Sequence, residues 1–409
     1  MKGKLIKKII ACACSLALAG ALVPAMAVSA FAAAGDPVVF TVQAQEIGTD
    51  TAKVIKEYTE ADLAEITANY PPKYYVMNGS NGTTVYSATK YIELDSLLYE
   101  FSQWDDGAYF IPTCYKKGST TETELYGKCA YSYDMMDENG YFWPNQTGTS
   151  GEKYTGDGGD VWWNGPVLAT TYSKAGLGGE SGYTTAVEAG NAASANTPED
   201  GNRIMMGSSY SDLQEGNVTG GFTFCSGVTG LVIYYPHSLS TAKVTAPTLT
   251  YNGKTQTVVP TVKDADGDTL STSNYVVYGN KVKKAGTYKI SVLGKDQSAE
   301  YGKSTITYKN WNGSKTIKVK VNMKKPGKLK VKSGKKKITV KWAANGATKY
   351  KVFYKAQGAK KWTKTKATKA TSKTIKKLGT GKKYQVKVVA TASGVGSKTF
   401  KTVTSKVVK

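Results

Sequence analysis

The sequence predicts a mostly β protein of several domains, in which an α+β front unit with a mainly β core precedes two all-β sandwiches. Three observations support this prediction. A chain of 409 residues is longer than one hydrophobic core usually organises. Apolar and polar residues alternate at strand spacing in many segments, including 38–42, 317–321 and 384–388. In the back half, Gly, Asn and Asp turn signals separate the short strands at the spacing of a sandwich.

The charge is strongly polarised along the chain. Residues 35–240 carry 26 acids against 10 bases, whereas residues 241–409 carry 40 lysines against 5 acids. From Tyr301 onward there are 32 lysines, and Arg, Asp and Glu are all absent. Such asymmetry bears on partners and solubility and leaves the fold open.

Residues 1–34 have the pattern of a secretory signal peptide. Four lysines precede an apolar run from Ile9 to about Val23, and small residues follow it near Ala34. No later apolar stretch is long enough to span a membrane. We therefore expect a secreted, extracellular or cell-wall-associated protein without a transmembrane segment after signal removal.

The front unit, residues 35–240, is expected to be acidic, aromatic and α+β. Thr59, followed by acids, predicts a helix start. An apolar strand at 230–235 is expected to close the unit before Pro236. Long Gly-, Ser-, Asn- and Thr-rich stretches at 144–160 and 174–200 predict functional or disordered loops.

The second unit, residues 245–321, contains short strands between turn signals. An Asn252-Gly253 turn opens it, and a strand at Gly286-Thr287-Tyr288 follows. This series resembles the bacterial immunoglobulin-like repeats of cell-surface proteins. The resemblance implies an immunoglobulin-like sandwich in a bacterial surface protein.

The third unit, residues 326–409, has Trp342 at the end of one predicted strand, and Leu378 and Tyr384 precede and begin another. With these residues the unit resembles a fibronectin type III domain. Trp342 matches the core tryptophan of that family's second strand. Leu378 lies six residues before Tyr384, which is the spacing of the tyrosine corner. The resemblance implies a second immunoglobulin-like sandwich. Because no Arg-Gly-Asp occurs, the integrin contact of some relatives is not implied.

The lysines are expected to decorate the outer faces of these sandwiches. One interpretation is adhesion to an anionic cell-wall polymer or acidic glycan through salt-screened attraction. The alternative is a passive, soluble surface that also protects sheet edges. Specific nucleic-acid recognition would need Arg forks and stacking aromatics. The lysine-rich residues 301–409 contain no Arg, and their aromatic residues are expected at core positions.

The ligand-binding candidates lie in the front unit. Trp162 and Trp163, with Trp143 nearby in sequence, are candidates for a sugar-stacking platform beside glycine-rich loops. Burial of these tryptophans as loop anchors is the alternative. Asp157 and Asp160 in a glycine-rich loop join the candidates, although a flexible glycine loop explains this segment better than a site does. No metal site is predicted.

Three cysteines remain after the signal peptide. Cys114 and Cys129 flank a predicted hairpin and could form a disulfide, which would leave Cys225 over. Three separate buried thiols are the alternative.

No catalytic residue can be assigned from the sequence. The chain has one His, His237 in a predicted linker, and one Arg, Arg203. The sequence contains no Gly-x-Ser-x-Gly nucleophile elbow, no His-Glu-x-x-His zinc motif and no phosphate-binding P-loop. Carboxylate pairs that a polysaccharide hydrolase could use are Asp105 with Asp106, Asp134 with Asp137 and Glu138, and Asp157 with Asp160.

The order of segments 91–98, 166–169 and 203–206 before a closing strand resembles the molybdopterin-binding domain of sulfite-oxidase-type enzymes. That family holds its cofactor with a Cys thiolate and with Arg and His groups. With a single Arg and no suitably placed His, the resemblance implies a degenerate domain without its cofactor, so we expect no cofactor.

The function that follows from the sequence is binding or adhesion without catalysis. The front unit would present a ligand-binding surface for a glycan, or for a ligand on a host or neighbouring cell. The lysine-rich sandwiches would act as a stalk that contacts anionic wall polymers. An extracellular polysaccharide hydrolase, a degenerate oxidoreductase and a purely structural protein are the alternatives.

Overall fold

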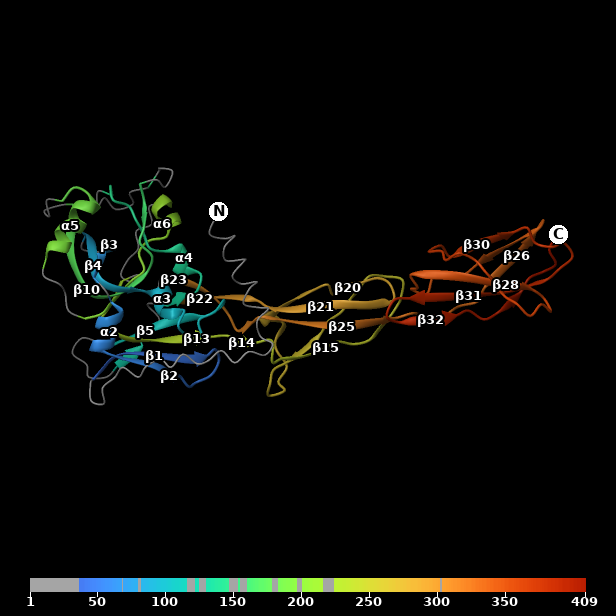
Figure 1. The fold of residues 1–409 in the computed structure, drawn as a ribbon, viewed down its shortest axis with the longest axis horizontal. Helices are drawn as coiled ribbons and strands as arrows, with labels where there is room; N and C mark the ends of the chain where they lie inside the picture. Colours follow the sequence, from blue (N-terminus) through green and yellow to red (C-terminus); the bar gives the residue numbers. More distant parts are fainter. Residues whose placement is uncertain are drawn as a thin grey trace.

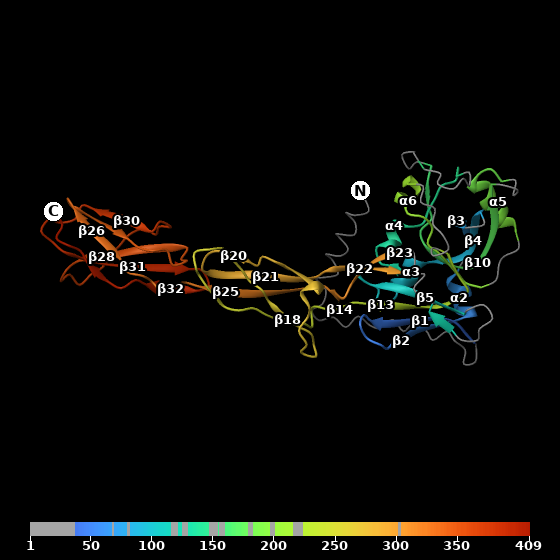
Figure 2. The ribbon, with the colours of Figure 1, turned by 180° about the vertical axis from the view of Figure 1, so that it is seen from behind.

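The computed structural model shows an elongated, mostly β molecule with a wider head at one end and two narrower β units in line with it (Figure 1, Figure 2). We call these parts the head (37–240), the middle unit (243–323) and the terminal unit (324–409). The described residues are 37–67, 69–79, 82–115, 122–124, 130–146, 154, 160–178, 183–196, 201–215, 224–301 and 304–409. The expected signal peptide lies outside them.

The first sheet of the head has the order β2-β1-β13-β5-β6, and β7 also pairs with β5. Strand β1 begins with the alternating sequence expected there, and its buried residues recur at every second position. It runs parallel to β13, with Thr41 opposite Gly230. The strands are β1 (Val38–Glu46), β2 (Lys53–Thr59), β5 (Tyr109–Tyr115), β6 (Glu122–Glu124), β7 (Tyr131–Ser132) and β13 (Val228–Tyr235).

The second sheet of the head has the order β12-β11-β10-β4-β3, which leaves β3 at one edge. Its neighbouring strands are antiparallel. The strands are β3 (Asn69–Gly79), β4 (Gly82–Glu93), β10 (Val167–Leu177), β11 (Arg203–Met205) and β12 (Phe224–Ser226). A short separate ribbon pairs β8 (Tyr141–Phe142) with β9 (Trp162–Trp163).

Short helices flank these sheets. The helix start predicted at Thr59 is confirmed, because its side chain and that of Asp62 cap each other's backbone N–H groups. Thr185 and Glu188 form the same capping box on α5, which packs on the second sheet through buried alanines. The helices are α2 (Glu60–Ile66), α3 (Leu94–Leu98), α4 (Met135–Glu138), α5 (Ala186–Ala195) and α6 (Tyr210–Glu215).

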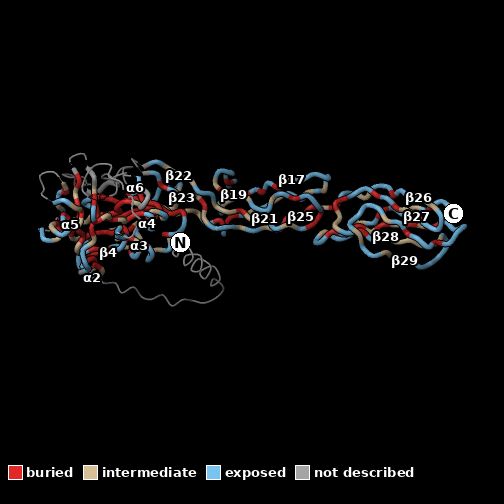
Figure 3. The backbone as a smooth tube through the Cα atoms, turned by 90° about the horizontal axis from the view of Figure 1, so that it is seen from above, coloured by how far each residue is buried: buried red, intermediate tan, exposed pale blue. Residues whose placement is uncertain are grey.

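The main core of the head contains side chains from both sheets. Phe40 and Leu231 of the first sheet belong to one buried cluster with Leu168 and Ile204 of the second. Figure 3 shows the buried residues concentrated in the head, with narrower buried strips along the two following units. The second sheet has a further buried cluster of its own, rich in tyrosine.

The middle unit is built around the sheet β16-β25-β21-β19, with short two-stranded pairs beside it. The Gly-Thr-Tyr segment predicted as a strand begins β21, and Ile290 on this strand is fully buried. The strands are β15 (Lys243–Thr245), β16 (Leu249–Thr250), β17 (Gln256–Thr257), β18 (Thr261–Lys263), β19 (Tyr275–Tyr278), β20 (Lys281–Val282), β21 (Gly286–Gly294), β22 (Asp296–Tyr301), β23 (Ser304–Lys309), β24 (Trp311–Asn312) and β25 (Ser314–Asn322). Strand β14 (His237–Ser238), at the end of the head, pairs with β24. A 3-10 turn, η3, spans Thr272–Asn274.

The hairpin β22–β23 packs on the head, although the sequence assigns its residues to the second unit. Ile306 is fully buried in one cluster with Tyr109 and Ile111 of β5. Tyr308 makes an edge contact with Tyr109 at 5.6 Å between ring centroids. The middle unit therefore shares part of its core with the head.

Polar contacts reinforce this junction. Lys309 lies 2.5 Å from Asp106 and 3.2 Å from Asp296, and its side chain is only 15% exposed. Burial opposes a charge on Lys309, but the bonds to Asp106 and Asp296 outweigh it, so the pKa of Lys309 is raised. His237, expected in a linker, lies 2.6 Å from Glu46 and stacks on Trp311. The junction is therefore structured rather than a free linker.

The terminal unit consists of two packed sheets, β26-β27-β30 and β29-β28-β31-β32 with β33 beside β31. Trp342 is buried in its core, as predicted. The hydroxyl of Tyr384 accepts a hydrogen bond from the backbone N–H of Gly379 at 2.9 Å, which is the bond expected of a tyrosine corner. The strands are β26 (Lys330–Gly334), β27 (Lys337–Lys341), β28 (Lys349–Ala356), β29 (Thr363–Lys364), β30 (Ser372–Lys376), β31 (Tyr384–Ala392), β32 (Gly396–Thr399) and β33 (Val403–Thr404).

The middle and terminal units also meet through packed side chains. Ala285 and Met323 of the middle unit belong to the buried core cluster of the terminal unit. The backbone N–H of Ala285 donates to the carbonyl of Gly346 at 2.9 Å. Gly346 has a positive φ and lies against the ring of Tyr251, so a side chain there would collide with the ring. Both junctions of the elongated molecule are thus closely packed.

Candidate ligand-binding face of the head

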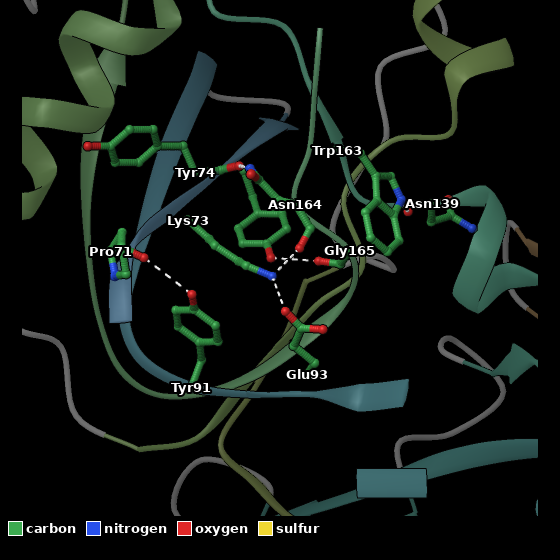
Figure 4. A network of polar contacts seen from close by, with 10 residues as sticks. Pro71, Lys73, Tyr74, Tyr91, Glu93, Asn139, Trp163, Asn164 and Gly165 are labelled. Carbon is green, nitrogen blue, oxygen red and sulfur yellow. Dashed lines mark hydrogen bonds and ion pairs between the residues drawn. The ribbon is translucent and has the colours of Figure 1, made fainter. Parts of the chain in front are cut away.

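The edge strand β3 positions the candidate site through Lys73 (Figure 4). The Lys73 ammonium donates to the Glu93 carboxylate at 2.7 Å and to the backbone carbonyl of Asn164, which lies 91 positions away in the sequence. The side chain of Asn164 in turn donates to the carbonyl of Tyr74 at 2.6 Å. The Lys73 side chain is 17% exposed, whereas Glu93 is 49% exposed. This arrangement fixes one carboxylate at the surface.

A small pocket of about 270 Å³ lies beside this network and is lined by Ile66, Tyr70, Tyr91, Ile92, Glu93 and Ser96. Tyr70 is 50% exposed, and its ring lies 5.3 Å from that of Tyr91. The Lys73 ammonium lies 5.1 Å from the Tyr91 centroid. Burial, with the nearby charge of Glu93, raises the pKa of Tyr91 to about 12. The Tyr91 hydroxyl therefore stays protonated at neutral pH and donates to the carbonyl of Pro71.

Trp163 lies next to Asn164 and is 53% exposed. Its indole N–H donates to the carbonyl of Asn139 at 3.0 Å, which fixes the orientation of the ring. The ring lies over Gly165, whose positive φ favours glycine. Trp163 thus presents a large, oriented aromatic surface close to the Lys73 network (Figure 4).

Trp162 faces the other way. Successive side chains of a strand point to opposite faces, and Trp162 pairs with Phe142 across the ribbon while Trp163 pairs with Tyr141. The Trp162 ring lies 5.6 Å from that of Phe142 and 6.5 Å from that of Tyr74. It is 45% exposed. The predicted platform is therefore divided, because the two indoles do not share one face.

Two other predicted ligand-binding residues, Trp143 and Asp160, meet at Tyr154. The Tyr154 hydroxyl donates to the Asp160 carboxylate at 2.5 Å. Its ring makes an edge contact with Trp143 at 5.5 Å, and the Trp143 side chain is half-buried. Trp143 and Asp160 thus belong to one cluster, separate from Trp163. The predicted partner Asp157 lies outside the described residues.

A larger groove of about 720 Å³ opens between the two sheets of the head. Its walls come from α2, β4, β10 and the segments before β11 and β13, and they contain several threonines with Asn202. Glu60 is the carboxylate of this groove, and Glu93 is that of the smaller pocket. A glycosidase needs two carboxylates across one bond, and the described lining of each pocket contains one.

The groups that a molybdopterin would require do not converge. Arg203 packs against the rings of both Tyr86 and Tyr172, with its guanidinium carbon 4.6 and 4.9 Å from their centroids. Cys225 is buried in the main core, where its sulfur lies 3.0 Å from the Tyr131 hydroxyl. His237 lies at the junction with the middle unit. These residues do not fit the cofactor, and we derive no chemistry through it.

Three further predictions stay at the level of the sequence. Cys114 is buried, but Cys129 lies outside the described residues, so their pairing stays a prediction. Within the described parts of the chain, no three His, Cys, Asp or Glu side chains are grouped as metal ligands. The described helices are all too short or too polar to cross a membrane.

The sequence did not point to Tyr70, Lys73, Tyr91, Glu93 or Asn164. They are spread over 95 positions and meet only because β3, β4 and the segment after β9 lie together. One signal was available. Lys73 is one of only ten bases in the acidic front unit, so an ion pair between each of these bases and a carboxylate could have been expected.

Comparison with known proteins identifies one family within the chain. Residues 324–406 match the family model of the fibronectin type III domain. This agrees with the resemblance carried by Trp342, Leu378 and Tyr384, and it covers about a fifth of the sequence. The chain matches none of the curated proteins with which it was compared.

Solved structures that resemble the chain do so over limited parts of it. A structure of titin kinase and its flanking domains is 23% identical and has a TM-score of 0.18. That match covers 22% of this chain and 17% of the titin chain. A two-domain fibronectin type III segment from chicken tenascin is 17% identical over 41% of this chain and 82% of its own, with a TM-score of 0.23. The FN5 domain of Drosophila Lar is 15% identical, with a TM-score of 0.19. That match covers 21% of this chain and 96% of the Lar domain.

Proposed function

We propose that this chain is an exported, cell-surface binding and adhesion protein without catalytic activity. Its head binds a glycan, and its lysine-rich middle and terminal units form a stalk that contacts anionic wall polymers. The proposal takes residues 1–34 as a signal peptide, and it treats 35–240, 245–321 and 326–409 as successive domains.

One observation on the head supports the glycan assignment. Trp163 and Tyr70 are about half exposed and lie at the two ends of the hydrogen-bonded network around Lys73. Aromatic rings stack on the apolar faces of sugars, and fixed polar groups beside them hold the sugar hydroxyls. The Glu93 carboxylate can accept hydrogen bonds from those hydroxyls, because it is half exposed and held in place by Lys73.

The stalk assignment rests on charge and shape. The terminal unit contains no Asp or Glu, so its lysines have no acidic side chain of their own unit to pair with. The molecule is extended, and the head lies at the end opposite to this basic unit (Figure 1). A basic end that contacts wall polymer would leave the face of the head available for a second ligand.

The glycan proposal can be tested with the full mature chain on a glycan array, followed by titration of the best glycan. Trp163→Ala should weaken binding about 30-fold, the usual cost of removing an aromatic anchor. Trp162→Ala is the matched control, because it removes the same side chain, at similar exposure, from the opposite face of the ribbon. Equal losses in the two variants, or no glycan bound by the wild type, would refute the assignment of this face.

A further inference from the structure

The terminal unit carries lysines and aromatic rings together on the outer face of one sheet. On β28, Tyr350 and Val352 point into the core, so Lys351, Phe353 and Lys355 point outward. Across the strands, Phe353 lies opposite Lys387 of β31 and opposite Lys364 of β29. We call Lys351, Phe353, Lys355, Trp362, Lys364 and Lys387 the lysine–aromatic face. The expectation that the aromatics of this unit lie in its core was wrong for Phe353 and Trp362, which are only half-buried.

Two lysines of this face lie against the same aromatic ring. The ammonium of Lys387 lies 4.6 Å from the centroid of Trp362, and that of Lys355 lies 5.2 Å from it. Lys387 also lies 5.7 Å from the centroid of Phe353. An aromatic ring attracts each cation, but the two ammonium groups repel one another. The indole thus holds two positive charges close together on a sheet surface.

Nothing acidic in the unit neutralises these charges. No Asp or Glu occurs after Glu300 in the sequence. Among the described residues, Lys309 is the lysine after that point that has carboxylate partners, and it lies at the head junction. An anionic group placed beside Lys355 and Lys387 would relieve their repulsion and gain two attractions at once.

We infer that the lysine–aromatic face is a binding site for a linear phosphodiester polymer without nucleic-acid bases. The inference rests on the proposed stalk function and assigns it a place and a ligand chemistry. On β28, Lys349 and Lys351 are two positions apart and Lys351 and Lys355 are four positions apart, which is about 6.8 Å and about 13.6 Å along the strand. These lysines form a row that a linear polyanion can follow. Lysine binds phosphate as a point charge and does not need the planar, bidentate geometry that arginine offers to carboxylate and phosphate groups.

The same geometry argues against nucleic acid as the ligand. Single strands bind proteins by stacking their bases on exposed aromatic faces. Here lysine ammonium groups already lie over Trp362 and Phe353, and they would have to be displaced before a base could stack. A polymer without bases needs only the ammonium groups, which the rings hold in place.

The other sheet of the same unit provides a matched control. Lys337 and Lys341 point outward from β27, because Ile338 and Val340 between them are buried. Both are exposed, and Thr339 lies between them where the lysine–aromatic face has Phe353. Replacing these two lysines changes the net charge of the unit as much as replacing Lys355 and Lys387.

The test measures binding of the full mature chain to a synthetic glycerol-phosphate oligomer, to inorganic polyphosphate and to single-stranded DNA of the same charge. The double variant Lys355→Gln with Lys387→Gln should bind the glycerol-phosphate oligomer about 30-fold more weakly, since each lysine at an anionic surface contributes about a fivefold factor. The double variant Lys337→Gln with Lys341→Gln should change it less than about threefold, because the screened attraction falls off within a Debye length of about 8 Å. Trp362→Leu should weaken binding and Trp362→Phe should largely restore it.

The outcomes separate the site from the stalk function. Equal losses in the two double variants would overturn the site and leave a general attraction of the stalk for polyanions. Tighter binding of DNA than of both phosphate polymers would overturn the ligand assignment. Preference for polyphosphate over the glycerol-phosphate oligomer would show that charge density alone decides binding and would overturn the phosphodiester assignment. If no polymer binds the wild type, the proposed stalk function fails as well.

Discussion

Replacing Ile306 with alanine should uncouple the head from the middle unit. Ile306 lies on the hairpin β22–β23 and is fully buried against Tyr109, Ile111 and Ala130 of the head. Truncation removes three carbon atoms from this contact. At about 0.8 kcal/mol per buried methylene group this loses about 2.4 kcal/mol, and the cavity left behind raises the total to about 3 kcal/mol.

A matched variant separates coupling from general destabilisation. Ile290 is also fully buried, but it lies in the middle unit's own core with Val258 and Val319. Ile290→Ala removes the same atoms and should cost a similar free energy without touching the head. The assay is calorimetric unfolding of the full chain, together with small-angle X-ray scattering of the folded state.

The two variants should behave differently. With Ile306→Ala, the unfolding of the head should separate from that of the middle unit, and the scattering should show a wider range of molecular lengths. With Ile290→Ala, the melting temperature should fall while the scattering profile stays that of the wild type. A loss below about 1 kcal/mol in Ile306→Ala, outside the range for buried isoleucine, would refute the shared core, as would equal scattering changes in both variants.

Two further predictions concern single tyrosines. Absorbance titration should show Tyr91 ionising at a pKa of about 12, and Glu93→Gln should lower this value by removing a nearby negative charge. The pKa of Tyr91 in the folded chain lies above the unfolded value of 10.0. The stability that Tyr91 contributes is therefore complete below pH 10 and is lost as the pH rises through about 12. An unchanged Tyr91 titration in Glu93→Gln would contradict the role of the Glu93 charge. Tyr384→Phe should leave the backbone N–H of Gly379 without its acceptor and cost about 1–2 kcal/mol in urea unfolding. A cost near zero would mean that water replaces the hydroxyl.

Features set by short stretches of sequence could be predicted well. Trp342, Leu378 and Tyr384 belong to a fixed spacing within one small sandwich, and the structure places Tyr384 in its corner as expected. The capped start of α2 at Thr59 depends on residues three positions apart. In each case the interaction is local, or it is repeated so regularly in a family that the spacing alone identifies it.

The candidate site of the head could be predicted only in part. Trp163 was found from its residue type, but nothing in the sequence told it apart from Trp162. Their difference arises because adjacent residues of a strand face opposite ways, and only the pairing of β9 with β8 decides which way each faces. The contact between Lys73 and Asn164 spans 91 positions and depends on tertiary packing throughout.

The alternation of lysines with apolar residues predicted the strands of the terminal unit, but the prediction that its aromatic residues lie in the core was wrong for two of them. An aromatic residue in a strand is usually assigned to the core, because burial of its ring stabilises the fold. Phe353 follows Val352, whose side chain is buried in the core, so strand alternation turns Phe353 to the outer face, and Trp362, just before β29, packs against lysines of that same face. Their rings are instead covered by Lys355 and Lys387, an arrangement that sequence periodicity does not distinguish from burial.

The packed junctions bear on how binding at the two ends would combine. A flexible linker would let the head and the terminal unit engage their ligands independently, and each added degree of freedom would lower the effective concentration of the second site. Here Ile306 joins the core of the head, and Ala285 with Met323 joins that of the terminal unit. These packed contacts should restrict the direction of the face around Trp163 relative to the lysine–aromatic face. Polymer bound along the terminal unit would orient the head as well as retain it, so loosening the Ile306 contact should weaken adhesion to a glycan-coated surface even when the affinity of each site is unchanged.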